Sequence, residues 1–265
     1  MTAAQTPTPG AARSVVAKLV PLLEAVAAAG EGISVREIAR STGIDRSAVS
    51  RLFKQLEDLD MVEQSALSGR FLPGPRLLSM SQMLNRRGWL ERVALPVLQD
   101  LVEQFDETVY LIVREFDQVR YQERIECRQA IRYVIELGDT SPLHVGAAGR
   151  AVLMGLPRAD LDDYLNRADM RPFTGETVTS PESIRTMADE DRARGYAVSL
   201  GERTEGGRGI AAPLFRADGE CLGALLWTCP QVRFDTDQVP EVAEAVRSAS
   251  RELSRRLGWE GRYPA

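Results

Sequence analysis

Two short amphipathic segments joined by a glycine, within residues 34–59, constrain the fold more than any other stretch of this chain. Ser34 and Glu37 have the S-x-x-E spacing of a capping box, which predicts that a helix begins there. Gly43 ends this helix at a position that favours a left-handed backbone, and Asp45 caps the next helix. Two helices joined by a glycine turn predict a helix-turn-helix.

The second helix has one apolar face and one polar, basic face. The apolar residues recur with helical spacing, at Val49, Leu52, Phe53, Leu56 and Leu59. The residues predicted to contact DNA are Arg46, Ser47, Ser50, Arg51, Lys54 and Gln55 on the opposite face, with Arg40 and the cap residue Asp45. Arginine suits guanine, short serines allow close approach to the major groove, and Lys54 and Arg40 suit phosphates. The alternative is an ordinary helix pair with a solvated polar face.

Segments on both sides complete a winged module. Apolar spacing predicts a scaffold helix over about 14–29, with Pro21 as a local fault. After the helix-turn-helix, residues 61–64 and 70–73 flank a polar turn and predict a small hairpin, the wing. We expect Arg70, near its tip, to reach a DNA backbone or the minor groove.

The remainder of the chain mixes strand-like runs with helices. Strands are predicted over 108–115, 119–125, 131–137, 196–200, 210–215 and 222–228, and helices over 90–105, 160–167, 181–194 and from 236 or 240 to 257. Residues 142–154 pass from a strand end into a helix of small residues, whose free backbone N–H groups are a candidate site for an anionic ligand. Tight packing of this helix on a sheet is the alternative.

Composition limits the remaining function classes. The net charge of −5 argues against binding nucleic acid over the whole surface, so a DNA surface must be local. There is no long apolar run and no signal-peptide core, which predicts a cytoplasmic protein. The three cysteines, Cys127, Cys221 and Cys229, fit neither a disulfide framework nor a metal knuckle, and we expect buried free thiols.

Catalytic and cofactor motifs are missing from the sequence. His144 is the single histidine, so a cluster of histidine metal ligands cannot be built, and we predict no metal and no cofactor. Cys127, His144 and Asp139 have the residue types of a hydrolase but no accompanying nucleophile elbow or oxyanion motif. The glycine-rich stretch 201–209 lacks the lysine of a phosphate-binding loop. We therefore predict no catalytic residues.

Several ordered blocks of the chain resemble the IclR family of bacterial transcription regulators. They are the segment from TGIDRSAVSRLFKQLEDLDMVE to SGRFLPGPRLL, then SPLHVGAAGRAVL, then GYAVSLGERTEGGRGIAAPLFRADGECLGAL. The resemblance covers about residues 13–258. It implies an α+β chain in which a winged helix-turn-helix is joined by a connector helix to a GAF-like mixed α/β domain that binds small organic acids.

The resemblance also implies which residues line an effector pocket. Mapped onto this chain, they are Ala147 and Ala148 at the start of the small-residue helix, together with Ser199, Gly209, Ile210, Leu226 and Thr228. Tyr133 and Trp227 are candidates for ring contacts, and the alternative for Trp227 is that alternation along the last strand turns it outward. Many family members have Asp, Cys and Ser at the positions of Ser199, Gly209 and Leu226, so this pocket is expected to be less polar. An aromatic or longer apolar carboxylate is the predicted effector.

The residue patterns and the family resemblance together predict how the chain is divided into domains. It comprises a disordered arm (1–12), a winged helix-turn-helix (13–74), a connector helix (75–88), an effector-binding and oligomerisation domain (89–258) and a tail (259–265). The predicted function is a homo-oligomeric regulator, dimer or tetramer, that binds double-stranded operator DNA and responds to a small carboxylate. The alternative is a winged-helix protein-interaction module without specific DNA binding.

Overall fold

The computed structural model describes residues 15–85 and 88–263, so the arm predicted over residues 1–12 lies outside the described residues. The chain divides into two compact units, residues 1–89 and residues 90–265. No helix in the described part of the chain combines the length and apolar character needed to cross a lipid bilayer.

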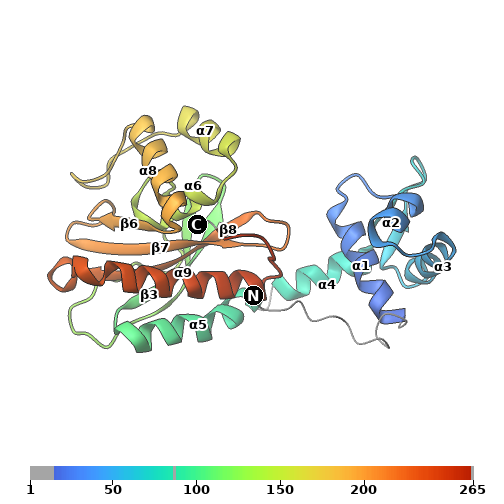
Figure 1. Ribbon diagram of the computed structural model, residues 1–265, viewed down its shortest axis with the longest axis horizontal. Helices are drawn as coiled ribbons and strands as arrows, with labels where there is room; N and C mark the ends of the chain where they lie inside the picture. The colour runs from blue at the N-terminus through green and yellow to red at the C-terminus, as the bar shows by residue number, and fades with distance from the viewer. Residues whose placement is uncertain (1–14, 86–87, 264–265) are drawn as a thin grey trace. The chain divides into compact units, whose positions relative to one another are not determined.

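The first unit is a winged helix-turn-helix, as predicted (Figure 1). Its elements are α1 (Val15–Ala28), α2 (Val35–Thr42), α3 (Arg46–Glu57), the strands β1 (Val62–Gln64) and β2 (Phe71–Pro73), and α4 (Pro75–Asn85). Ser34 caps α2, with both hydrogen bonds of the capping box present, and Gly43 ends that helix with a φ of 69°. The Asp45 carboxylate accepts from the Ala48 N–H at 3.1 Å and thereby caps α3.

A small apolar core holds these elements together. Its buried side chains come from every element between α1 and β2: Leu22, Val26, Ile38, Val49, Leu52, Phe53, Leu56, Val62 and Phe71. The rings of Phe53 and Phe71 lie 4.4 Å apart, which joins α3 to the wing. Two backbone hydrogen bonds, of 2.8 and 2.9 Å, also join Phe71 to Ile33 just before α2. Strand β2 of the wing is therefore fixed to α3 and to the residues just before α2.

The second unit is built on a six-stranded antiparallel sheet in the order β5-β4-β3-β8-β7-β6. Its strands are β3 (Thr108–Glu115), β4 (Gln118–Ile125), β5 (Thr140–Pro142), β6 (Ala197–Leu200), β7 (Gly207–Phe215) and β8 (Cys221–Pro230). Helices α5 (Trp89–Phe105) and α9 (Val239–Arg256) cover one face, and α6 (Gly146–Gly155), α7 (Arg158–Arg167) and α8 (Pro181–Arg194) lie on the other (Figure 1). Two short 3₁₀ turns, Gln231–Arg233 and Thr236–Gln238, precede α9.

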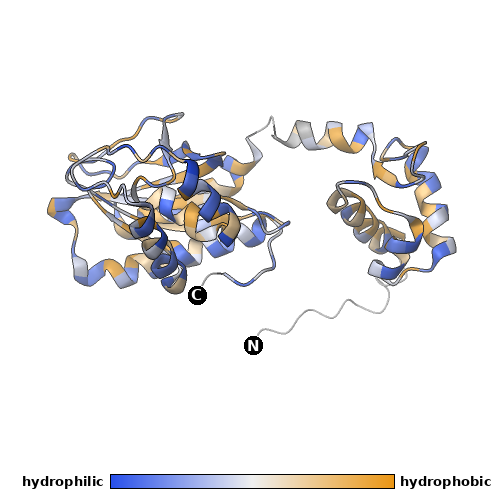
Figure 2. Cartoon of the chain, turned by 90° about the horizontal axis from the view of Figure 1, so that it is seen from above, coloured by the Kyte–Doolittle hydropathy of each residue, from blue (hydrophilic) through white to orange (hydrophobic). Residues whose placement is uncertain are grey.

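The central strands are buried on both faces, which explains why their sequences are almost continuously apolar. Along β3, Tyr110 and Ile112 pack in the core beneath α6, while Val109 and Leu111 pack in the core beneath α5 and α9. Figure 2 shows the matching pattern on the helices, which carry hydrophobic and hydrophilic stripes. Each fully buried Leu, Ile or Val contributes roughly 1.5–3 kcal/mol.

Two segments differ from the sequence analysis. The strand predicted over 131–137 is wrong: these residues form an irregular segment, and β5 takes the place beside β4. Residues 259–263, predicted to be a tail, belong to the second unit and pack on its core. Trp259 stacks on Phe215 with 4.6 Å between ring centroids, and the Tyr263 hydroxyl donates to the Pro213 carbonyl at 2.7 Å.

Candidate DNA interface and ligand pocket

The exposed face of α3 carries the polar residues that the sequence assigns to DNA contact. Ala48, Val49, Leu52, Phe53 and Leu56 of this helix are buried in the first unit. The exposed residues are Arg46, Ser47, Ser50, Arg51, Lys54 and Gln55, and Arg40 is also exposed in the last turn of α2. The helix therefore presents three cations on one solvent-facing side.

Asp45 is used for capping in this structure. Its carboxylate accepts from the Ser47 hydroxyl and from the Ala48 N–H. These hydrogen bonds, the one from Ser47 first, hold the pKa of Asp45 below its usual value. Asp45 and Ser47 are therefore already partners of one another at the helix start.

Arg70 lies at the loop end of the wing, immediately before β2, and its carbonyl accepts from the Ser65 N–H. Its Nη2 lies 2.9 Å from the Glu37 carboxylate, and its Nε donates to the Gly32 carbonyl at 2.9 Å. Hydrogen bonds from the Ser34 N–H and hydroxyl, followed by those from Arg70, lower the pKa of Glu37 to about 2. The Arg70 side chain thus joins the wing to the capping box of α2.

A cavity of about 90 Å³ opens in the second unit between the start of α6, strands β7 and β8, and the segment 133–135. We call it the α6 pocket. One ordered water needs roughly 10–15 Å³ on this measure, so the pocket has room for a small organic molecule. Among the described residues that line it, none is acidic.

The α6 pocket brings together almost all the predicted effector residues: Tyr133, Ala147, Ala148, Ser199, Gly209, Leu226 and Thr228. Ile210 is the exception, and its assignment to this pocket is wrong. Successive residues of a strand face opposite sides of the sheet, so Ile210, which follows Gly209, packs in the core beneath α9. Trp227 lies on that same far side for the same reason.

Gly209 determines the width of the pocket. A Cβ atom at this position would lie 3.2 Å from Leu226 Cδ1 and 3.6 Å from Ala147 Cβ. A larger side chain would therefore occupy the space between β7, β8 and α6. This supports the prediction that glycine makes the pocket roomier.

Sequence reasoning missed Tyr121, Ile135, Arg203 and Thr204, which also line the pocket. Tyr121 is 1% exposed, and burial raises its pKa to about 12. Arg203 lies in the glycine-rich stretch between β6 and β7, and its position in that stretch is the only sequence signal that pointed to it. The connecting segment between β6 and β7 therefore adds one charged and one hydroxyl side chain to the pocket lining.

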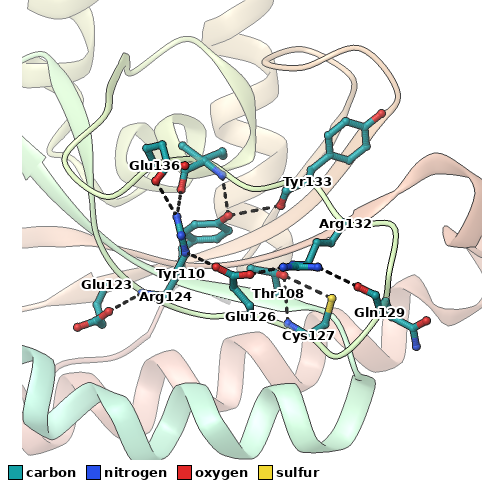
Figure 3. A network of polar contacts seen from close by, with 11 residues as sticks. Thr108, Tyr110, Glu123, Arg124, Glu126, Cys127, Gln129, Arg132, Tyr133 and Glu136 are labelled. Atoms are coloured by element: carbon teal, nitrogen blue, oxygen red, sulfur yellow. Dashed lines mark hydrogen bonds and ion pairs between the residues drawn. The ribbon is translucent and has the colours of Figure 1, made fainter.

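The segment 133–135 lines the pocket. Side-chain hydrogen bonds hold this segment in place, and strand pairing does not (Figure 3). The Tyr110 hydroxyl accepts from the Ile135 N–H at 2.9 Å, and Arg124 donates to the Ile135 carbonyl at 2.7 Å. The Tyr133 hydroxyl donates to the Glu205 carbonyl at 2.9 Å. This last hydrogen bond joins the segment to the glycine-rich stretch, so both pocket walls are connected.

A buried ionic cluster supports the start of α6. Arg150 is 1% exposed and donates to Asp191 at 3.0 Å, to Glu202 at 2.7 Å and to the Val198 carbonyl. Burial raises the pKa of both carboxyl groups, against the lowering effect of Arg150. Arg150 therefore joins α6 to α8, β6 and the glycine-rich stretch.

The residue types of a hydrolase do not meet in this fold. His144 is 1% exposed, and its ring nitrogens lie 3.1 Å from the Tyr164 hydroxyl and 3.0 Å from the Arg171 carbonyl. The Cys127 sulfur instead lies 3.6 Å from the Thr108 hydroxyl. All three cysteines are buried and free, as expected. Over residues 15–85 and 88–263, no group of His, Cys, Asp or Glu side chains has the arrangement of a metal site.

Comparisons with known proteins agree with this architecture. The family model described as the IclR helix-turn-helix domain matches residues 15–66, and the one described as the bacterial transcriptional regulator IclR C-terminal matches residues 83–255. BhcR of Paracoccus denitrificans is 31% identical over 227 residues, covering 86% of this chain and 81% of the relative. KipR of Bacillus subtilis is 29% identical over 227 residues, covering 86% and 90%. Both are named as HTH-type transcriptional regulators and not as enzymes.

Solved structures show the same fold. The IclR structure from Thermotoga maritima superposes with a TM-score of 0.64 at 26% identity and covers 92% of this chain and 98% of its own. An IclR homologue from Microbacterium hydrocarbonoxydans, complexed with 4-hydroxybenzoate, has a TM-score of 0.57 at 23% identity and covers 92% and 99%. The chain belongs to the IclR family of bacterial transcriptional regulators.

Proposed function

We propose that this protein is a cytoplasmic, homo-oligomeric regulator that binds a specific operator through α3 and is controlled by a small organic acid in the α6 pocket. The observation that carries the DNA-binding part is the exposed basic face of α3 above a fully packed apolar face. A helix of this kind fits the major groove, where base edges are distinguishable. We take the domain limits as 13–74, 75–88 and 89–258.

The residues of the basic face have different roles in this proposal. Arg46, Ser47, Ser50, Arg51 and Gln55 contact base edges, while Arg40 and Lys54 contact phosphates. Asp45 supports them by capping α3 and orienting Ser47. Arg70 acts at the DNA backbone only if it leaves Glu37, because the guanidinium is otherwise engaged.

A homo-oligomer sets the form of the operator. Helix α4 exposes Leu78, Met80 and Met83, and exposed apolar side chains grouped on one element favour association. Two copies related by a two-fold axis would place their α3 helices in successive major grooves. The operator is then a near-palindrome with half-sites roughly 10 bp apart, or a multiple of that spacing.

The character of the pocket supports an aromatic or longer apolar monocarboxylate as effector. Apolar surface comes from Val134, Ile135, Ala147 and Leu226, and the described lining has no acidic side chain. A very small polyoxygenated acid would leave hydrogen bonds unmade here, at a cost of about 1–3 kcal/mol each. The Microbacterium protein holds 4-hydroxybenzoate. At 23% identity, that structure is evidence for the fold alone. The proposed class of effector therefore rests on the residues that line the α6 pocket.

Regulation requires that the effector distinguish two forms of the protein. An acid that binds the DNA-competent and incompetent forms equally cannot shift their populations. The connector helix, α4, is the element through which we propose this coupling. By linkage, effector and operator then change one another's equilibrium affinity by the same factor. Equal effector affinity with and without operator DNA would contradict the proposal.

The first test is fluorescence anisotropy with DNA from the region upstream of the protein's own gene and with a scrambled duplex, at several salt concentrations. We expect tighter binding to the native fragment and a linear loss of affinity with the logarithm of salt concentration, because bound cations are released. Absence of binding to either duplex, with and without carboxylates, would favour the protein-interaction module instead.

A further inference from the structure

Arg203 is a cationic side chain in the lining of the α6 pocket, and one of its donors has no acceptor among the described residues. Its side chain is 20% exposed, and its Nε atom is buried without a hydrogen-bond partner. A guanidinium N–H that loses water and gains no acceptor costs free energy, more than a neutral group does. The α6 pocket is therefore bordered by a positive side chain whose hydrogen-bonding capacity the surrounding protein does not fully use.

The remaining contacts of Arg203 hold it in place without neutralising it. The guanidinium carbon lies 4.8 Å from the centre of the Tyr121 ring, a cation–π distance. Within residues 15–85 and 88–263, its ion-pair partner is Asp139, with Nη2 and Oδ2 4.0 Å apart and the Asp139 side chain 55% exposed. Solvent screens a pair of that length and exposure. A carboxylate inside the pocket would therefore meet little competition.

Two other groups are less suited to bind the anion. The Gly146 N–H at the start of α6 acts on a carboxylate of the chain: burial raises the pKa of Glu202, Arg150 lowers it, Asp191 raises it and the Gly146 N–H lowers it. Arg208 also borders the pocket, but along β7 it alternates with Gly209 and shares the side of Ile210. Its Nη1 donates to the Gly207 carbonyl at 3.0 Å.

We infer that Arg203, held against the face of Tyr121, is the group that binds the carboxylate of the effector and sets the specificity of this pocket for monocarboxylates over neutral analogues. This inference rests on the proposed organic-acid function. The two Nη groups of a guanidinium form paired donors that match a carboxylate. The body of the ligand then contacts Ile135 and Leu226, which line the same pocket.

The test compares benzoate with benzamide, its neutral counterpart of similar shape, by isothermal titration calorimetry on the full chain. We expect the unaltered protein to bind benzoate at least tenfold more tightly than benzamide. Arg203→Gln should weaken benzoate binding by about 10- to 100-fold and benzamide binding by less than about threefold, because only the charged ligand loses a charge-assisted bidentate pair. The matched control, Arg208→Gln, should keep the preference for benzoate.

Further variants make each outcome decisive. Arg203→Lys keeps the charge but not the paired donors and should recover only part of the lost affinity; it also serves if Arg203→Gln does not fold. A benzoate preference that survives in both Arg203 variants would overturn the role of Arg203 alone. If benzoate, hexanoate and related monocarboxylates all fail to bind the unaltered protein, the result contradicts the proposed organic-acid effector. It then also contradicts the role inferred for Arg203. The control is the operator affinity of Arg203→Gln without ligand. If this affinity is unchanged, the variant is folded and the loss of benzoate binding arises in the pocket.

Discussion

The basic face of α3 and the α6 pocket place arginines in opposite surroundings. On α3, Arg46 and Arg51 are exposed, and water solvates their charge until DNA is bound. In the second unit, Arg150 is 1% exposed and the Arg203 side chain 20% exposed, so each needs an acceptor supplied by the fold or by a ligand. Substitution should therefore affect binding at the first site and folding or ligand choice at the second.

The largest expected effect is at Arg150. Arg150→Ala leaves Asp191 and Glu202 buried without their shared partner, and we expect a loss of about 3–5 kcal/mol in the free energy of unfolding. Urea titration followed by tryptophan fluorescence suits this test, because Trp227 and Trp259 both belong to the second unit. Arg158→Ala is the matched control: it breaks a half-exposed pair with Asp189, which should cost under about 1 kcal/mol. Equal effects of the two variants would show that burial of charge is not what distinguishes these regions.

The next effect concerns operator binding. Arg51→Ala should reduce the free energy of operator binding by about 1–3 kcal/mol and relax specificity, if Arg51 contacts a base. Lys54→Ala, one turn further along α3, should instead weaken native and scrambled duplexes alike and lower the salt slope by about 1. Anisotropy with both duplexes measures each quantity. If Arg51→Ala and Lys54→Ala change the affinities for the two duplexes in the same way, the proposed division between base and phosphate contacts is wrong.

A smaller effect is expected at the pocket wall. Tyr133→Phe removes the hydrogen bond to the Glu205 carbonyl, worth about 0.5–1.5 kcal/mol, while keeping the ring in the lining. We expect benzoate to dissociate roughly 3- to 10-fold faster, measured by stopped-flow fluorescence. The free energy of unfolding should change by no more than the hydrogen bond itself. An unchanged dissociation rate would show that this contact does not retain the ligand.

The smallest effect is a pH dependence in the winged unit. The pKa of Glu37 falls from 4.5 to about 2 on folding, so its stabilising contribution is present above pH 4.5 and is lost as the pH falls toward 2. The stability gap between the unaltered protein and Glu37→Gln should therefore close over that range in thermal unfolding followed by circular dichroism. The stability of the Arg70→Gln variant should keep part of this pH dependence, because the hydrogen bonds from Ser34 to the Glu37 carboxylate remain. A gap that stays constant down to pH 2.5 would contradict this assignment.

The winged unit was predictable because its signals are local. The capping box at Ser34, the turn at Gly43 and the apolar spacing of α3 each involve residues within four positions of one another, so the sequence contains the whole pattern. The contacts of Arg70 were less predictable. Its partners Glu37 and Gly32 lie more than thirty residues away, and hairpin spacing gives the place of Arg70 in the wing but not these contacts.

The second unit was predictable in its elements and less so in its pocket. Strand alternation, once the register is known, separates Gly209 from Ile210, but the resemblance alone placed both in the lining. The segment 131–137 has β-branched and aromatic residues typical of a strand. Its backbone groups instead bond to side chains of Tyr110 and Arg124 on neighbouring strands, which the sequence pattern does not reveal.

The sequence by itself determined the helix-turn-helix, the basic face of α3 and most of the secondary structure, because these depend on spacing of 2 and 3.6 residues. The tertiary structure decided which charges are buried and with whom: Arg150 with Asp191 and Glu202, and Arg203 against Tyr121 with a free donor. The physical reason is that desolvation depends on every segment packed around a group, and these segments are distant in the sequence.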